Sequence, residues 1–187
     1  MSEIKAIETK YNGYHFRSRL EARWAVFFDT LGIKYEYEPE GFDLTEIWKK
    51  ADPNADRLQA HQVWYLPDFY LPDYEYYLEI KATGTLESQL DSLDRCLLFG
   101  KQKPLLMIIG TPGFDYEVFE VSRSNEEYYG PWVFAQDRKC TCLILMREGY
   151  GAVCLRPNCD GPKCFQNDSE EHAELEEAYI AARSARF

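Results

Sequence analysis

The chain has 187 residues and a formal net charge of −11, and 45% of its residues are hydrophobic. The apolar content excludes wholesale disorder, and the length fits one domain or one domain with an appendage. The acidic balance argues against broad, nonspecific contact with nucleic acid, although a local site can bind phosphate if metal ions offset part of the repulsion.

No targeting or membrane-spanning segment is evident in the sequence. The N-terminal stretch MSEIKAIETKYNG lacks the apolar core of a signal peptide, and no run approaches the roughly 18 apolar residues of a membrane span. We therefore expect a soluble protein of the cytoplasm with no membrane partner.

The first predicted elements are a helix and a strand. Apolar residues in RSRLEARWAVFFDTLGI recur on one helical face, with Ser18 as the expected N-cap and Gly32 as the expected stop. The alternating stretch 33–38 (IKYEYE) predicts a strand. The polar stretch 39–61 predicts a long loop with about one turn of helix.

A hairpin, a second helix and two further strands are predicted next. The hairpin covers WYLPDFYLPDYEYYLEIK, residues 64–81. Leucines at helical spacing between residues 86 and 98 predict the helix, which Gly100 would end. The run 104–110 is apolar at nearly every position, as in a central strand covered on both faces, and 116–121 predicts another strand. This order implies an α/β fold, a mixed central sheet flanked by helices.

The C-terminal third has a different character. Short strands are expected at 132–134, 143–146 and 152–155 around a group of cysteines, followed by a helix from about residue 169 with acids in its first turn. We divide the chain into a core at residues 1–125 and a small Cys-containing β appendage with a C-terminal helix at residues 126–187.

The predicted hairpin brings acidic residues together. If Asp73 and Tyr74 form a two-residue loop, Asp68 lies opposite Glu79. If Pro72 and Asp73 form the loop, Asp68 faces Tyr77 and Glu79 is its diagonal neighbour. Both registers leave Asp68, Glu79 and Lys81 on one face, because side chains alternate with a period of two.

Two acids and an amine on one face suggest a metal site. Opposed side chains lie about 5 Å apart at Cβ, so two carboxylates there repel unless a positive charge lies between them. An oxygen-preferring cation, Mg²⁺ or Mn²⁺, fits that position, and Lys81 can hold or deprotonate a water beside it. Asp73 is expected to serve the turn instead. A solvated face of alternating charges is the alternative reading.

The same residues carry a family resemblance. Pro67-Asp68, ten intervening residues and Glu79-Ile80-Lys81 resemble the motif of the PD-(D/E)xK nuclease superfamily, with its restriction-endonuclease-like core. The text FRSRLEARWAVFFDTLGIKYEYEPEGF, followed by YLPDFYLP and YLEIKATG, is similar to phage-type members, in particular to the junction-resolving endonuclease I of tailed phages. The similarity covers residues 16–84.

The resemblance implies phosphodiester hydrolysis and a set of site residues. Asp68, Glu79 and the Ile80 carbonyl would bind Mg²⁺ (or Mn²⁺), and Lys81 would orient the nucleophile or stabilise charge in the transition state. Glu21 would hold a second metal or an outer-shell water. Its alternative role is a capping box with Ser18. At the opening of the same helix, Arg17 and Arg19 are candidate phosphate contacts, or else solvated surface arginines.

We therefore expect a Mg²⁺-dependent nuclease that acts on DNA, with endonuclease action favoured over exonuclease action. The expected setting is a phage or mobile element, and a phage-encoded protein would act in the host cytoplasm. The acidic charge departs from the basic surface of the resolving enzymes, so junction resolution is not carried over. A homodimer or a protein partner is compatible with this reading. The alternatives are a catalytically weak nuclease-fold module that binds nucleic acid or protein, and an acidic DNA-mimic inhibitor.

Five cysteines gather in the C-terminal third. Without a secretion signal, metal binding is favoured over a disulfide framework. We expect Cys140, Cys142, Cys159 and Cys164 to bind structural Zn²⁺, with Cys154 as an alternate ligand. The spacing departs from the usual C-x2-C pair, so reduced buried thiols are the alternative.

Overall fold

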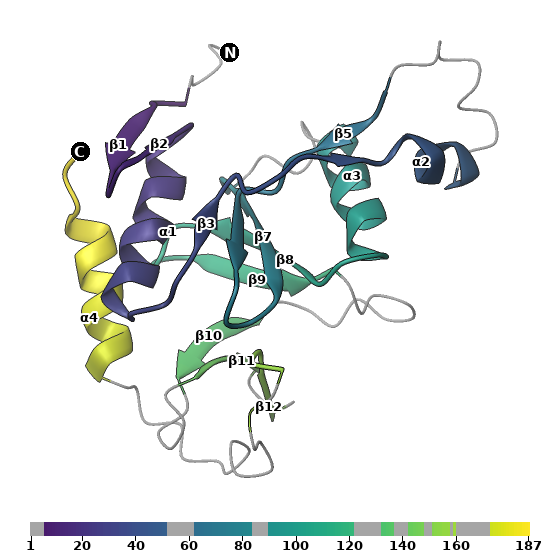
Figure 1. Ribbon diagram of the computed structural model, residues 1–187. Coiled ribbons are helices and arrows are strands. Elements are labelled where there is room, and N and C mark those ends of the chain that lie inside the picture. Colours follow the sequence, from purple (N-terminus) through teal and green to yellow (C-terminus); the bar gives the residue numbers. More distant parts are fainter. Residues whose placement is uncertain are drawn as a thin grey trace.

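The computed structural model describes residues 6–51, 62–83, 90–121, 132–136, 142–147, 151–157, 159 and 173–187. The elements in this part of the chain form one main sheet, three small sheets and helices around them (Figure 1). In chain order they are β1 (Thr9–Tyr11), β2 (Tyr14–Phe16), α1 (Arg19–Thr30), β3 (Glu36–Tyr37), β4 (Phe42–Asp43), α2 (Thr45–Ala51), β5 (Trp64–Tyr65), β6 (Phe69–Leu71), β7 (Tyr76–Lys81), α3 (Leu90–Gly100), β8 (Leu105–Gly110), β9 (Tyr116–Glu120), β10 (Val133–Gln136), β11 (Leu143–Arg147), β12 (Gly151–Cys154) and α4 (Ala173–Ser184).

The main sheet is mixed, as predicted. Its strand order is β3-β6-β7-β8-β9, in which β7 and β8 run parallel and the other neighbours run antiparallel. The parallel pair requires a crossover connection, and α3 lies in that connection. The predicted central strand is confirmed, because β8 lies between β7 and β9 and all six of its residues are buried.

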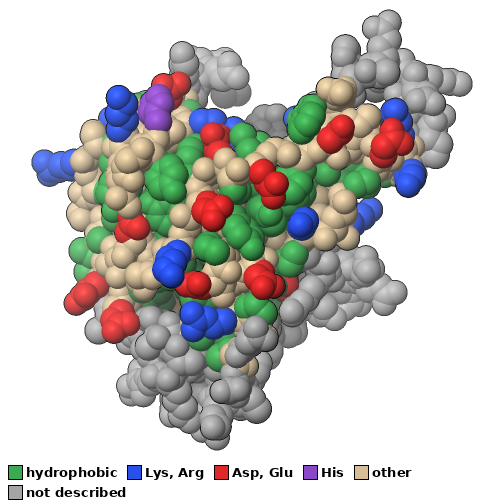
Figure 2. Space-filling view, viewed as in Figure 1, with side chains coloured by type: hydrophobic (Ala, Val, Ile, Leu, Met, Phe, Trp, Pro, Cys, Tyr) green, Lys and Arg blue, Asp and Glu red, His purple; other side chains and the backbone are tan. Residues whose placement is uncertain are grey.

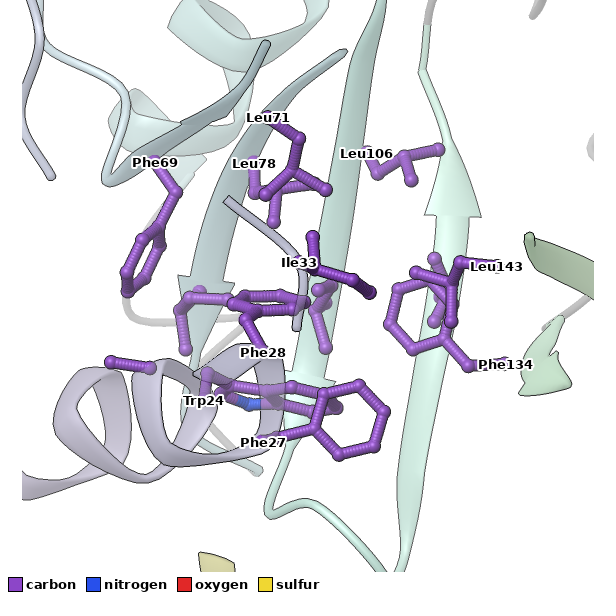
Figure 3. Close-up of a cluster of buried hydrophobic side chains, with 14 of the residues drawn as sticks. Trp24, Phe27, Phe28, Ile33, Phe69, Leu71, Leu78, Leu106, Phe134 and Leu143 are labelled. Atoms are coloured by element: carbon purple, nitrogen blue, oxygen red, sulfur yellow. The ribbon is translucent and has the colours of Figure 1, made fainter. Parts of the chain in front are cut away.

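Two hydrophobic clusters lie on opposite faces of this sheet. Leu106 and Ile108 of β8 pack with α1, whereas Leu105, Met107 and Ile109 pack with α3. Because neighbouring residues of a strand point to opposite faces, this division places α1 and α3 on different sides. Figure 3 shows the aromatic side chains of α1 packed over the strands of the first cluster. The prediction of an α/β fold with helices flanking a mixed sheet is therefore confirmed.

Helix α1 begins and ends at the predicted residues. The Ser18 side chain accepts a hydrogen bond from the Glu21 N–H at 3.1 Å, which satisfies one of the unpaired donors of the first turn. Gly32 adopts a positive φ of 66°, the left-handed conformation that favours glycine after a helix. The buried face of α1 includes Trp24, whose indole N–H donates to the Gly110 carbonyl at 3.1 Å.

The β6–β7 hairpin adopts the first of the two predicted registers. Phe69 pairs with Leu78 and Leu71 with Tyr76, so the residue before β6, Asp68, lies opposite Glu79. Asp73 is exposed in the turn, as expected. The turn is closed by a hydrogen bond from the Tyr74 N–H to the Leu71 carbonyl at 3.1 Å.

Two stretches before the hairpin differ from prediction. The strand expected at 33–38 is shorter, because only β3 (Glu36–Tyr37) pairs with β6. Within the stretch 39–61, predicted as a long loop with about one turn of helix, β4 forms and pairs with β5, and the helical turn is the longer α2. The Asp43 carboxylate accepts a hydrogen bond from the Thr45 N–H at 2.9 Å at the start of α2. This local Asx interaction could not be distinguished in a stretch that is polar throughout.

The C-terminal third packs into the same core as the main sheet. The predicted short strands are confirmed as β10, β11 and β12, which form an antiparallel sheet. Figure 1 shows α4 lying beside α1, and the ring of Tyr179 stacks on Phe27 with centroids 5.1 Å apart. Leu143, Leu145 and Leu175 belong to the cluster under α1. The division after residue 125 stays a prediction, since residues 122–131 lie outside the described part.

Among the described residues, no helix combines the length and the apolar character that crossing a membrane would require.

Candidate active site

The candidate site lies at the end of the main sheet where β6 begins and β7 ends. Asp68 and Glu79 are opposed across the two strands, and Lys81 follows two residues later on the same face. Asp68 is 3% exposed and Glu79 is 6% exposed. The face they share carries Tyr77 and the cluster under α3. Buried acids are rare in proteins unless they are paired, so their partners decide how this arrangement is stable.

Asp68 is held on both of its oxygens. Its Oδ2 accepts from the Ile80 N–H at 2.7 Å, and its Oδ1 accepts from the Arg17 guanidinium at 2.6 Å. Burial, followed by the charges of Glu79 and Glu21, raises the pKa of Asp68 well above its usual value, although the Ile80 and Arg17 donors lower it in part. Three carboxyl groups therefore interact here, and the position favours any added positive charge.

Glu79 is held by an amine and a phenol. The Lys81 ammonium donates to its Oε1 at 2.5 Å, and the Tyr65 hydroxyl donates to its Oε2 at 2.8 Å. Burial alone would lower the pKa of Lys81, but the adjacent charge of Glu79 outweighs it and raises the pKa above its usual value. Lys81 is therefore a protonated donor in this arrangement, which favours charge stabilisation over proton abstraction.

A buried thiol completes this side of the site. The Sγ atom of Cys96 in α3 lies 3.6 Å from the Tyr65 hydroxyl. Burial, followed by the charge of Glu79, raises the pKa of Cys96 to about 12, so the thiol is neutral at physiological pH. Cys96 is thus an inert packing residue.

Glu21 is 8% exposed and belongs to the cap of α1. Its Oε1 accepts from the Ser18 hydroxyl at 2.7 Å, and its Oε2 accepts from the Tyr37 hydroxyl at 2.6 Å and from the Arg17 N–H at 3.1 Å. The expected capping box therefore forms with a shift of one residue, because Glu21 reaches the N–H of Arg17 rather than that of Ser18. The charge of Glu21 also contributes to the raised pKa of Asp68, so Glu21 lies near enough to influence the candidate site.

The two candidate phosphate-binding arginines differ in their surroundings. Arg17 joins the first turn of α1 to the acids, because its guanidinium contacts Asp68 at 2.6 Å and Glu38 at 2.7 Å. Arg19 is exposed on α1. In the described part of the chain, the face in Figure 2 carries Lys and Arg side chains dispersed among acids rather than in one basic patch. On this face, any phosphate contact is therefore local.

The donor set fits a hard divalent cation. Asp68 and Glu79 offer carboxylate oxygens, the ligands that Mg²⁺ prefers. The Ile80 N–H points toward Asp68, and in a strand the N–H and C=O of one residue point to the same side, so the Ile80 carbonyl faces the same edge. In this structure Arg17 pairs with Asp68 and Lys81 pairs with Glu79, and a bound cation would replace part of that positive charge.

Sequence reasoning missed two tyrosines of the site. Tyr65 lies in the stretch predicted as hairpin, but it belongs to β5, which pairs with β4 and not with β7, and Tyr37 comes from β3. Tyr65 stands three residues before Asp68 in a segment that Pro67 interrupts, so strand alternation could not assign its direction. Tyr37 alternates within 33–38, but only the pairing of β3 with β6 brings its hydroxyl to Glu21.

A second cluster lies in the C-terminal sheet. The Sγ atoms of Cys142, Cys154 and Cys159 all lie within 4.8 Å of one another, an arrangement that could hold a metal ion. Cys154, expected only as an alternate ligand, is thus part of the cluster. The other two predicted ligands, Cys140 and Cys164, lie outside the described residues.

Comparison with known proteins identified no family for this chain. No protein-family model matches the sequence, and no curated protein matches it significantly.

Proposed function

We propose that this protein is a metal-dependent nuclease that hydrolyses phosphodiester bonds, with DNA as the expected substrate. The observation that carries the proposal is the opposition of two buried acids, Asp68 and Glu79, with Lys81 on the same strand face. A purely structural hairpin gains nothing from two buried carboxylates on directly opposed residues, whereas a site for a divalent cation requires such ligands.

Asp68, Glu79 and the Ile80 carbonyl are the groups that would hold Mg²⁺ or Mn²⁺. When bound, the ion would lower the pKa of a coordinated water and stabilise negative charge on the phosphate. Tyr65 holds Glu79 in place through its 2.8 Å hydrogen bond, and the Ile80 N–H holds Asp68. These donors fix the carboxylates before any ligand arrives, which is the usual function of groups that contact metal ligands.

The two cations of the site have separate roles in the proposal. Lys81 is largely buried and protonated, so its ammonium would donate to an oxygen of the phosphate or of the attacking water. Arg17 is half-exposed, and its guanidinium can exchange Asp68 and Glu38 for a phosphate oxygen while remaining charged. Glu21 would add a second metal position or hold an outer-shell water if its cap contacts rearranged.

The proposed substrate, a nucleic acid, rests on the resemblance to the PD-(D/E)xK nucleases. The PD-(D/E)xK pattern supports phosphodiester cleavage, and the similarity to phage-type members supports endonuclease action in a phage or mobile-element setting. The net charge of −11 disfavours strong binding to nucleic acid in the absence of divalent ions. Cleavage should therefore depend steeply on the divalent metal.

The test is cleavage of supercoiled, linear and single-stranded DNA, and of RNA, by purified protein with Mg²⁺ or Mn²⁺. Asp68→Asn and Lys81→Met should reduce cleavage at least 100-fold. Asp73→Asn, which changes the other Pro-Asp pair of the same hairpin, and Lys103→Met, which changes an exposed lysine, are the matched controls and should cleave like wild type. Equal cleavage by Asp68→Asn and Asp73→Asn would refute the proposed site.

A further inference from the structure

The three clustered cysteines converge because of strand register and one turn. Cys142 directly precedes β11 and Cys154 ends β12, where it pairs with Ile144. Cys142 and Ile144 are two residues apart, so Cys142 and Cys154 share one face of this sheet. Cys159 returns to them through a turn closed by its N–H bonding to the Arg156 carbonyl at 3.3 Å. Three thiols from separate points of the chain thus meet at one end of the sheet.

The separation of the sulfur atoms matches a tetrahedral metal centre. With Zn–S bonds of about 2.3 Å at tetrahedral angles, two sulfur atoms lie about 3.8 Å apart. The Sγ atoms of Cys142 and Cys159 are 3.8 Å apart, and the third lies within 4.8 Å of both. A disulfide bond would require about 2.05 Å. Sulfur atoms that bind separate irons of a cluster lie further apart than those around one ion.

We propose that Cys142, Cys154 and Cys159 bind a structural Zn²⁺ that joins the ends of β11 and β12 to the turn after β12, beside the tip of the β6–β7 hairpin. Zinc is the ion expected for a thiolate set of this geometry. The zinc assignment does not depend on the nuclease proposal, since it uses none of the same residues. Structural zinc takes four ligands, and Cys140 and Cys164 are the remaining cysteines of this part of the sequence.

The contacts around the thiols explain what the ion would stabilise. The N–H of Leu143, the residue after Cys142, donates to the buried Tyr74 hydroxyl at 3.1 Å. The Arg156 guanidinium, between Cys154 and Cys159 in the chain, lies 5.9 Å from the centre of the same Tyr74 ring. Tyr74 belongs to the turn of the hairpin that carries Asp68. An ion holding these strand ends together would therefore fix the two groups, the Leu143 N–H and the Arg156 guanidinium, that contact Tyr74.

The first experiment measures metal in the wild-type protein, purified under reducing conditions without added chelator. We expect about one zinc per chain by elemental analysis. After removal of the metal, titration with Co²⁺ should produce the thiolate charge-transfer and tetrahedral d–d absorption bands, and zinc should displace them. Absence of zinc together with failure to take up Co²⁺ would overturn the proposal, as would iron with sulfide in place of zinc.

The second experiment uses cysteine variants. Cys142→Ser, Cys154→Ser and Cys159→Ser should each lose most of the zinc, whereas Cys96→Ser, which changes a buried thiol outside the cluster, should retain it. Full zinc content in all three cluster variants would refute the assignment. If those variants do not fold, thiol alkylation of the wild type decides: the cluster cysteines should react many-fold faster after metal removal, and equal rates with and without metal would refute it.

The variants Cys140→Ser and Cys164→Ser identify the fourth ligand by the same metal measurement. Asp68→Asn should keep its zinc, which separates this centre from the proposed active site. Loss of zinc in Asp68→Asn would contradict the proposal of two independent metal positions.

Discussion

Replacement of Asp68 by asparagine should make the metal-free protein more stable while abolishing cleavage. Asparagine keeps the shape of the side chain and can still accept a hydrogen bond from Ile80, but it carries no charge. Burial and the charges of Glu79 and Glu21 raise the pKa of Asp68 above its unfolded value. Ionised Asp68 therefore costs stability at neutral pH, and the cost vanishes below its unfolded pKa of about 4.

The expected gain is the difference between relieved repulsion and lost attraction. If the carboxylate separation equals the Cβ spacing of opposed strand residues, about 5 Å, the two charges repel by about 3 kcal/mol at an effective dielectric constant of about 20. The variant loses the ion pair with Arg17, which is taken as about 1 kcal/mol because the guanidinium is half-exposed. It also weakens the charged hydrogen bond from Ile80 by about 1 kcal/mol. The net expectation is a stabilisation of about 1 kcal/mol.

The assay is urea unfolding of wild type, Asp68→Asn and the control Asp73→Asn, with a chelator and with Mg²⁺. At Mg²⁺ about tenfold above the dissociation constant, wild type gains about 1.4 kcal/mol and the advantage of Asp68→Asn disappears. Asp73→Asn should stay within about 0.5 kcal/mol of wild type in both conditions. Destabilisation of Asp68→Asn by more than about 1 kcal/mol in chelator, or equal stabilisation of both proteins by Mg²⁺, would refute the reasoning.

Three further predictions test the surroundings of the site and the core. Tyr65→Phe removes the 2.8 Å donor to Glu79 and should weaken Mg²⁺ binding about 10- to 100-fold by calorimetry, and an unchanged affinity would contradict the positioning role. Ser18→Ala removes the N-cap of α1 and should cost about 1 kcal/mol in urea unfolding, whereas Ser18→Thr should keep most of the stability. Burial raises the pKa of Tyr116 to about 12, so the unfolded chain loses this proton first and stability should fall by up to about 3 kcal/mol between pH 10 and 12. The fall should be shallower in Tyr116→Phe when unfolding is followed against pH.

The local sequence pattern was sufficient to predict most of the helices and strands. Helix α1 was predictable from its apolar stripe, Ser18 and Gly32, because caps and periodicity act over a few residues. The all-apolar stretch of β8 likewise indicated a strand covered on both faces. Local pattern failed at β4, a short strand that depends on pairing with β5, and it predicted only one turn of helix where α2 forms. The packing of α4 on α1 could not be predicted from local pattern either, because it joins residues far apart in the chain.

For the candidate site, the sequence alone determined that Asp68, Glu79 and Lys81 share a face, since strand alternation holds for either even-length turn. Only the tertiary structure decided between the two hairpin registers. It also showed that the Arg17 guanidinium contacts Asp68 and that the Tyr65 hydroxyl contacts Glu79. In the C-terminal sheet, it showed that Cys154 belongs to the thiol cluster. The physical reason is that alternation is a property of one strand. The partner of a buried charge, by contrast, is set by which distant segments pack together, and no local pattern records that.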